Sequence, residues 1–316
     1  MKSRAHLLVA ILLLAGASVA GAQSPGRQTA NRAVHDLNFS EQEEHRLGAD
    51  VSTRLRERYG VVQDAAVHRY VTLVGSVVAA GSARADLPWT FIVLDTEGVN
   101  AFSAPGGFVH ITRGALALIG NESELAGVLA HEVGHVMARH TIRMIQKTRV
   151  EGGLANAATR GAFLEQVGKR LYAVTLASPF DRSDEMEADH IGVALANHAG
   201  YAPAGVGGFL AKLAERNAAT LERSGMFASH ADTRVRLDRL ASEIRKYNFE
   251  ATAAGQARYA AAITYTPIAI DAVRAGAPGS ANPDRDARGG SNQAAVVVTV
   301  TAAEIAEFRR GLSWRP

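Results

Sequence analysis

The chain contains no cysteine among its 316 residues, so it can form neither a disulfide bond nor a lipid-modified N-terminal cysteine. It also has no basic run interleaved with aromatic residues, and its formal net charge of +3 gives no support for nucleic-acid binding. After the N-terminus, no apolar stretch reaches the length of about 18 residues that a membrane span requires. The 47% hydrophobic content supports a sizeable core in one large or two small domains.

The N-terminus is typical of a secretory signal peptide. Lys2 and Arg4 precede an apolar run over residues 7–15, and small residues follow it. We expect cleavage after Ala22, a flexible polar leader over residues 23–38, and a location in a periplasm or another exported compartment. A retained anchor, with peripheral membrane association, is the alternative, although the apolar core is short for a span of about 20 residues.

The most informative stretch is His131-Glu132-Val133-Gly134-His135. Histidines four residues apart lie on the same face of an α-helix, so both imidazoles can reach one Zn²⁺ ion. The glutamate between them can take a proton from water that the ion activates. This pattern predicts a zinc peptidase with one Zn²⁺ per chain. A chance match on an ordinary amphipathic helix is the alternative for the motif taken alone.

The residues around the motif predict a buried helix. Asn121 can cap a helix that begins near Glu122, with Glu124 three residues after the cap. Gly127 and Gly134 each cost about 1 kcal/mol relative to alanine inside a helix. Glycine at these positions makes sense if another backbone packs close to the metal site.

A zinc site needs a third protein ligand, and the best candidates are two acidic residues downstream. Glu185 and Asp189 are four residues apart, so they share one face of a helix. One carboxylate can complete a site of two histidines and one glutamate, and the other can accept a hydrogen bond from a ligand histidine. Glu187 is the fallback ligand. The alternative is an ordinary solvated acidic helix start, as most such clusters are.

The two motifs together resemble the gluzincin metallopeptidases that include the type I CAAX prenyl protease, HtpX and the periplasmic chaperone-protease BepA. Three further features match: an edge-strand segment over residues 100–114, Arg182 three residues before Glu185, and His230 with Arg236 six residues later. The resemblance covers residues 39–245 and is strongest to the soluble periplasmic, BepA-like members, although the tetratricopeptide array of BepA is absent.

The resemblance implies roles for the matching residues. They are the zinc ligands His131, His135 and Glu185, the general base Glu132, Asp189 as hydrogen-bond partner of a ligand, and His230 and Arg236 as stabilisers of the oxyanion. In some relatives the histidine that matches His230 can also bind zinc and hold the enzyme shut. Ala231 stands where the family usually has proline, which would stiffen the loop. A surface-loop histidine is therefore the alternative for His230.

The segment ahead of the metal helix is predicted to bind substrate. Residues 102–103 and 108–112 flank a Pro-Gly-Gly bend, which indicates paired strands or a strand with a bulge. An edge strand could hold an extended peptide through its free N–H and C=O groups, whereas an ordinary hairpin is the alternative. The predicted substrate-binding residues are Asn100, Ala101, Phe102, Gly106 and Gly107, and His110 would line the cleft. His140 and His198 are predicted to be helix-surface residues.

The expected fold is α+β and mostly α: a zincin-like metallopeptidase domain over residues 39–250, with a small sheet and an edge strand beside the metal helix. Residues 251–316 would form a linker and a small accessory segment. Further helices are predicted over residues 41–59, 67–80, 203–219, 233–247 and 302–312, a strand over 89–94, and a mobile lid or loosely packed helix pair over 150–178.

The predicted function is that of an exported zinc endopeptidase acting on protein or peptide substrates, namely unfolded or misassembled outer-membrane or other envelope proteins. Two alternatives remain. In one, His230 gates the zinc site and the protein works chiefly as a chaperone or assembly factor. In the other, the fold is a scaffold without metal.

Overall fold

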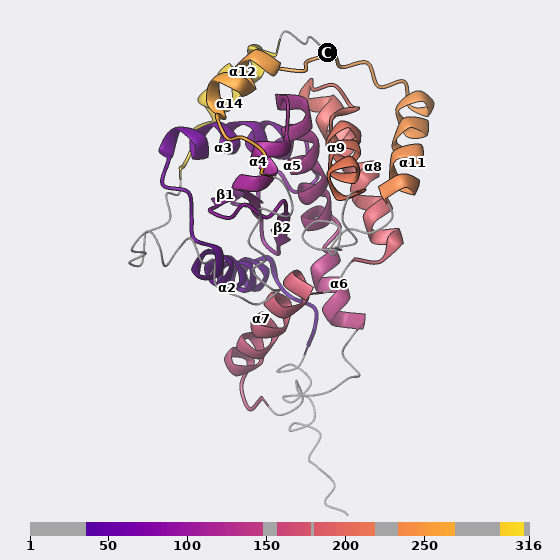
Figure 1. Ribbon diagram of the computed structural model, residues 1–316. Coiled ribbons are helices and arrows are strands. Elements are labelled where there is room, and N and C mark those ends of the chain that lie inside the picture. The colour runs from indigo at the N-terminus through magenta and orange to yellow at the C-terminus, as the bar shows by residue number, and fades with distance from the viewer. Residues whose placement is uncertain (1–35, 148–156, 178–179, 219–232, 269–297, 313–316) are drawn as a thin grey trace, which may run out of the picture.

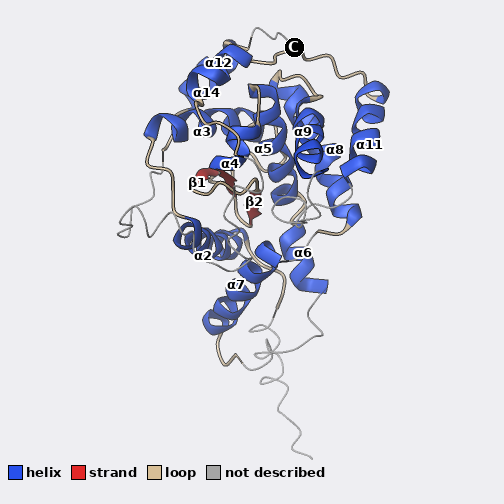
Figure 2. Ribbon diagram, in the orientation of Figure 1, coloured by secondary structure: helices blue, strands red, loops and turns tan. Residues whose placement is uncertain are grey.

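A computed structural model describes residues 36–147, 157–177, 180–218, 233–268 and 298–312 (Figure 1). The predicted signal peptide and His230 lie outside these residues. Helices surround one small sheet (Figure 2), so the prediction of an α+β, mostly α fold is confirmed. The elements are α2 (Glu41–Tyr59), α3 (Ala65–Ala79), β1 (Thr90–Leu94), β2 (Ala101–Ala104), β3 (Phe108–Thr112), α4 (Arg113–Leu118), α5 (Glu122–Met137), α6 (His140–Lys147), α7 (Arg160–Ala177), α8 (Arg182–Ala199), α9 (Gly205–Ala218), α11 (Thr233–Lys246), α12 (Gln256–Ala262) and α14 (Ala302–Arg310).

The sheet has the strand order β1-β3-β2, with β3 parallel to β1 and antiparallel to β2. Its two faces pack against different helices. Phe91 and Val93 of β1 join the core beneath α3 and α5, whereas Ile92 and Leu94 join a second core with α2 and α7. Because successive side chains point to opposite faces and both faces are covered, most side chains of the three strands are apolar. The predicted paired strands are confirmed, and β2 is an edge of the described sheet.

Helix α5, which carries His131 and His135 and is therefore the predicted metal helix, runs through the larger core. Gly127 lies so close to α9 that a Cβ there would be 2.4 Å from the backbone nitrogen of Val206. A Cβ at Gly134 would be 2.9 Å from the carbonyl oxygen of Ala188 in α8. Both glycines therefore let a neighbouring backbone approach α5, as their positions in the sequence predict.

Helix α7 differs from the prediction of a mobile lid or loosely packed helix pair. Residues 150–156 and 178 of that prediction lie outside the described part of the chain. Within residues 157–177 there is one helix, Arg160–Ala177, and its Phe163, Val167 and Leu171 are buried in the core shared with α2. Their spacing of four residues places them on one apolar face of the helix. The periodicity of this face is weak in the sequence because glycine and alanine residues surround it.

The C-terminal segment packs on the same core as the metal helix. Tyr259 and Ile263 belong to the core cluster that contains most of the buried apolar residues of α5, and so does Leu312 after α14. The short helices α4 and α12, of six and seven residues, were not predicted. The boundary at residue 250 stays a prediction, but the described part of residues 251–316 shares its core with the residues before it.

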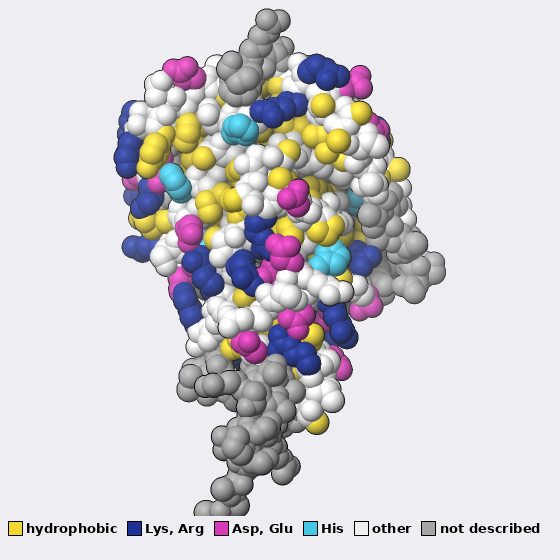
Figure 3. All heavy atoms as spheres, turned by 180° about the vertical axis from the view of Figure 1, so that it is seen from behind, with side chains coloured by type: hydrophobic (Ala, Val, Ile, Leu, Met, Phe, Trp, Pro, Cys, Tyr) yellow, Lys and Arg dark blue, Asp and Glu magenta, His cyan; other side chains and the backbone are white. Residues whose placement is uncertain are grey.

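The surface carries both signs of charge. On the face seen in Figure 3, Lys and Arg side chains lie intermixed with Asp and Glu. None of the described helices is both long enough and apolar enough to cross a membrane.

Two glycines allow α2 to contact the β2–β3 turn. A Cβ at Gly48 would lie 1.8 Å from the carbonyl oxygen of Pro105, and one at Gly106 would lie 2.4 Å from the Cα of His45. Gly106 and Gly107 also have φ of +73° and +100°, a conformation that favours glycine. The turn is therefore built for contact with α2.

We expect Gly48→Ala to destabilise the protein by about 1–3 kcal/mol, because the added methyl group displaces the turn. The gain in helix propensity, about 1 kcal/mol, is too small to offset this displacement. Gly207→Ala in α9 is the control, since its Cβ would make only an ordinary contact, 3.7 Å from Leu237 Cδ2. Urea unfolding of both variants measures the difference. A Gly48→Ala protein as stable as Gly207→Ala would contradict the close packing of α2 on the turn.

Candidate metal centre

Helix α5 supplies the two histidines of the motif. Its N-cap is Asn121, whose side chain accepts a hydrogen bond from the backbone N–H of Glu124, so the predicted helix start is confirmed. His131, Glu132 and His135 are all buried on this helix. A capped helix packed on several sides holds the backbone of the motif in place.

Helix α8 brings the acidic residues to the histidines. It crosses α5 where a Cβ at Gly192 would lie 2.9 Å from the backbone nitrogen of His131. At this short separation, Glu185 and Asp189 are buried beside the α5 imidazoles. The predicted second half of the site, some 50 residues downstream in the sequence, therefore lies next to the first.

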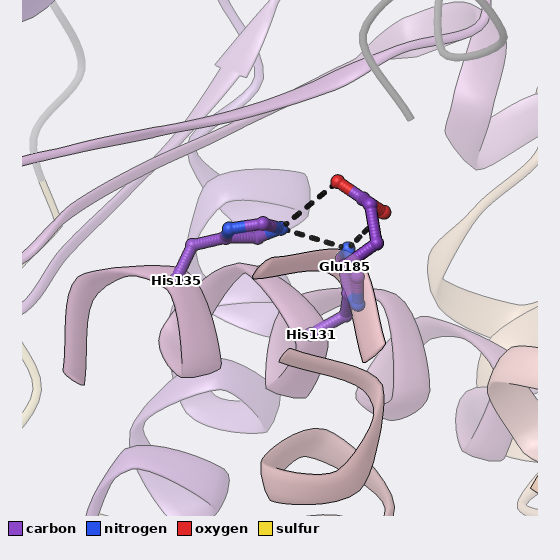
Figure 4. A group of neighbouring side chains, drawn as sticks. All are labelled: His131, His135 and Glu185. Carbon is purple, nitrogen blue, oxygen red and sulfur yellow. Dashed lines mark hydrogen bonds and ion pairs between the residues drawn. The ribbon is translucent and has the colours of Figure 1, made fainter. Parts of the chain in front are cut away.

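Three donor groups converge in this site (Figure 4). The Nε2 atoms of His131 and His135 are 3.1 Å apart. The Glu185 oxygens lie 3.5 Å from each of them, Oε2 from His131 and Oε1 from His135. Ligands placed tetrahedrally at about 2.0–2.1 Å from Zn²⁺ are separated from each other by about 3.3–3.4 Å. The donor set and its spacing therefore fit one tetrahedral metal ion, and these three residues form a group that could hold one.

Asp189 contacts the opposite nitrogen of His131. Its Oδ1 lies 3.0 Å from His131 Nδ1, so with Nε2 turned to the other donors the Nδ1–H can donate to this carboxylate. Burial alone would raise the pKa of the Asp189 carboxyl, but hydrogen bonds from Arg236 and His131 hold that pKa well below its usual range. The carboxylate is thus ionised where an acceptor for a ligand histidine is needed.

Arg236 is the buried cation of the site. Its Nε and Nη2 donate to the two oxygens of Asp189 at 2.8 and 2.7 Å, and its Nη1 lies 2.9 Å from Glu185 Oε2. In the structure this guanidinium is the counter-charge of two carboxylates. Its predicted contact with an oxyanion stays a prediction.

His140 is not a surface residue, so that prediction is wrong. It is fully buried, and its Nδ1 lies 2.7 Å from Nδ1 of His135. The reason is a helix break: Arg139 has φ of +56°, and α6 begins after it in a new direction, so the periodicity of α5 does not continue. Burial lowers the pKa of the His140 imidazole, although the Glu187 carboxylate opposes the shift.

Two other residues near the motif occupy places that the sequence did not indicate. Glu187, the fallback ligand, contacts His140 and Arg143 and is not part of the donor group. The ring of Phe180, just before α8, stacks on the imidazole of His135 at 4.1 Å between centroids. No motif or periodic pattern marks Phe180 in the sequence.

The predicted substrate-binding residues fall into two places. Ala101 and Phe102 lie on the edge strand β2, directly after Asn100, and β2 packs beside α5. Gly106 and Gly107 lie in the buried β2–β3 turn, where a Cβ at Gly106 would meet His45 of α2 and one at Gly107 would meet Pro88 and Trp89. Only the first group has backbone on a sheet edge next to the metal helix.

His110 does not lie on an edge strand. It is on the central strand β3, and its Nε2 lies 2.9 Å from Ser52 Oγ of α2. Burial lowers the pKa of His110 to about 3, so its ring is neutral. His110 therefore packs in the α2 layer of the core, and the prediction that it lines the cleft is not supported.

Comparisons with known proteins agree with this geometry. The family model described as Peptidase family M48 matches residues 65–244, more than half of the chain. A "Beta-barrel assembly-enhancing protease" of Yersinia pestis is 28% identical over 240 residues, covering 71% of this chain and 49% of that protein. A protein of the same name from Escherichia coli (strain K12) is 27% identical over 185 residues, 55% of this chain and 38% of that protein.

A eukaryotic protein is also similar. The "Mitochondrial metalloendopeptidase OMA1" of Schizosaccharomyces pombe is 34% identical over 164 residues, covering 51% of this chain and 49% of that protein. The matched region thus spans about half, or less, of the length of each of these relatives.

Proposed function

Because the chain belongs to peptidase family M48, we propose that it is a zinc-dependent endopeptidase that hydrolyses peptide bonds in protein substrates. The observation that carries the proposal is the convergence of three buried donors, two imidazole nitrogens and one carboxylate, at the separations of a tetrahedral site. His131, His135 and Glu185 would hold the ion. A scaffold without metal gives no reason for three such donors to be buried together.

The chain's own side chains account for the proton transfers. When bound, Zn²⁺ would polarise the scissile carbonyl and lower the pKa of a water molecule toward ~7. Glu132, on the same helix as both histidines, would accept the proton of that water and pass it to the leaving amine. Asp189 would fix the ring of His131 through Nδ1, and Arg236 would hold Asp189 and Glu185 in place.

Substrate would bind as an added strand. β2 is an edge of the described sheet and lies beside α5. The backbone N–H and C=O of Asn100 are bonded to Thr112 of β3, so the alternation of an antiparallel strand turns the backbone groups of Ala101, rather than those of Asn100 and Phe102, to the open edge, where an extended peptide could pair with them. His230 and Arg236 are proposed to stabilise the oxyanion, on the strength of the family motif. Gly106 and Gly107 are left out of this role, because they lie in the buried turn, Gly106 against α2 and Gly107 against residues 88–89.

We further propose that the protein is exported and acts on unfolded or misassembled envelope proteins. Two of the similar proteins are named as proteases that enhance β-barrel assembly, and residues 1–22 have the pattern of a signal peptide. A natural substrate can be trapped with an inactive variant that still binds it and then identified by mass spectrometry.

Glu132→Gln tests the mechanism. We expect the variant to retain one zinc per chain and to lose proteolysis of an unfolded protein by at least about 100-fold, since an amide cannot act as general base. Glu215→Gln, at an exposed position of α9, is the control and should cleave like the wild type. Zinc is measured by elemental analysis and cleavage by peptide release. Unchanged cleavage by Glu132→Gln would remove the mechanism, and a wild-type protein without metal would remove the proposed function.

The same variant separates proteolysis from a chaperone role. If the protein works chiefly as an assembly factor, Glu132→Gln will support folding of a denatured envelope protein as well as the wild type does. Loss of that assistance together with cleavage would assign the effect to proteolysis.

A further inference from the structure

The imidazole of His135 has neighbours on its edge as well as on its face. At the edge, Nδ1 faces Nδ1 of His140 at 2.7 Å. His140 Nε2 lies 3.2 Å from Glu187 Oε2, and the Glu187 side chain is 46% exposed. A series of three contacting polar side chains, His135, His140 and Glu187, therefore runs from the candidate metal donors to the protein surface.

Metal binding would set the direction of these hydrogen bonds. An imidazole that offers the Nε2 lone pair to a metal carries its proton on Nδ1. The Nδ1–H of His135 would then donate to Nδ1 of His140, which accepts only if that atom carries no proton. The proton of His140 is consequently on Nε2, where it can donate to the carboxylate of Glu187. Each nitrogen and oxygen atom in this series is therefore either a donor or an acceptor, and the assignments are consistent with one another.

We propose that His140 is a positioning residue: by accepting the Nδ1–H of His135, it fixes the tautomer and the ring orientation that aim Nε2 of His135 at the metal. Buried hydrogen-bond acceptors behind ligand histidines commonly have this effect. The inference rests on the proposed metal-dependent function, and it adds a residue that none of the motifs assigns to the site.

The stacking of Phe180 on His135 does not make His140 redundant. The two rings lie nearly parallel, with 21° between their planes, so the stack restrains the tilt of the imidazole. A half-turn about the Cβ–Cγ bond would preserve this stack but would exchange the nitrogen and carbon edges of the ring. On the ring edge away from the other metal donors, the contact with His140 distinguishes the two orientations, because it requires Nδ1 there.

The group could instead be a second metal site, since His140, Asp184 and Glu187 lie close enough together to share an ion. Its charges are already balanced, however. Arg143 Nη2 lies 2.7 Å from Glu187 and 3.5 Å from Asp184, and Lys147 Nζ lies 3.8 Å from Asp184. One nitrogen of His140 also faces His135. These contacts favour a hydrogen-bonded support over a second ion.

The test compares His140→Leu with Ile142→Ala. Both changes remove a buried side chain from α6, but Ile142 belongs to the apolar core of α2 and α7. We expect His140→Leu to weaken zinc binding by about 10–100-fold in competition with a chelator. It should also change the visible absorption spectrum of the Co²⁺-substituted protein. Ile142→Ala should lower the unfolding midpoint and leave both metal readouts unchanged.

His140→Asn provides the rescue. Asn Oδ1 occupies about the place of His Nδ1 and can accept from His135, so this variant should recover most of the zinc affinity and the wild-type Co²⁺ spectrum. His140→Met is the second variant without an acceptor, for use if leucine prevents folding.

The outcomes separate this inference from the proposed function. If wild type binds zinc and the variants without an acceptor bind it equally well with an unchanged spectrum, His140 has no positioning role and the peptidase proposal stands. An asparagine variant as weak as leucine would likewise overturn the hydrogen-bond argument. A wild-type protein that takes up no zinc would overturn both.

Discussion

Arg236→Met should lower the free energy of unfolding of the metal-free protein by about 3–5 kcal/mol, because removing one partner of a buried ion pair leaves an uncompensated charge. Arg236 is 2% exposed and contacts the buried carboxylates of Asp189 and Glu185. Methionine fills a similar volume but carries no charge. Denaturant unfolding in the presence of a chelator measures the loss, and zinc affinity should also fall by about 10–100-fold.

The effect of Arg236→Met should depend on pH with a defined sign. The folded-state pKa of Asp189 is held below its usual range, so its contribution to stability is present above an ordinary Asp pKa of about 3.9 and is lost as pH falls through the folded value. The difference in unfolding free energy between wild type and variant is therefore expected to be largest near neutral pH and to shrink in acid.

Arg239→Met is the matched control for this prediction. Arg239 lies on the same helix, but it is 45% exposed and pairs with Glu243 one turn away. A pair of this kind contributes about 0–1 kcal/mol. Equal destabilisation by the two variants would show that Arg236 does not act as a buried counter-charge.

The core of the candidate site is predictable because its geometry follows from helical spacing. His131 and His135 lie on one face of α5, and Glu185 and Asp189 on one face of α8. A tetrahedrally coordinated ion needs a third protein ligand, so the sequence predicts that the second helix supplies it. The structure places these four side chains together, although their roles stay proposals.

The support around the site is not predictable in this way. The burial of His140 depends on the left-handed backbone conformation of Arg139. A single backbone angle outside the helical range changes which face of the following residues is buried. The position of Arg236 in the structure depends on how α11 packs against α8. Such contacts are set by tertiary structure, and neither spacing nor propensity encodes them.

The C-terminal segment provides another long-range contact that the sequence does not reveal. Arg258 of α12 forms a bidentate ion pair with Glu122, the first residue of the metal helix α5 and 136 residues away in the sequence. Glu122 is fully buried and also accepts a hydrogen bond from Tyr70 at 2.7 Å. Burial and the nearby carboxylate raise the pKa of Tyr70, so its hydroxyl keeps the proton that it donates.

Because of this contact, we expect Arg258→Met to lower the free energy of unfolding by about 3 kcal/mol, since the buried Glu122 carboxylate would lose its guanidinium partner. Adding Glu122→Gln to the variant should recover part of the loss, because a neutral amide costs less to bury than an unpaired carboxylate. Arg69→Met is the control: its partner Glu304 is on the surface, and the unfolding midpoint should barely move. Denaturant unfolding of the single and double variants gives the coupling between Arg258 and Glu122. If Arg258→Met unfolds like the wild type, the pair of Arg258 and Glu122 does not stabilise the N-terminus of α5. A measured loss near the expected value would instead make α12 a structural support of the helix that carries the histidines.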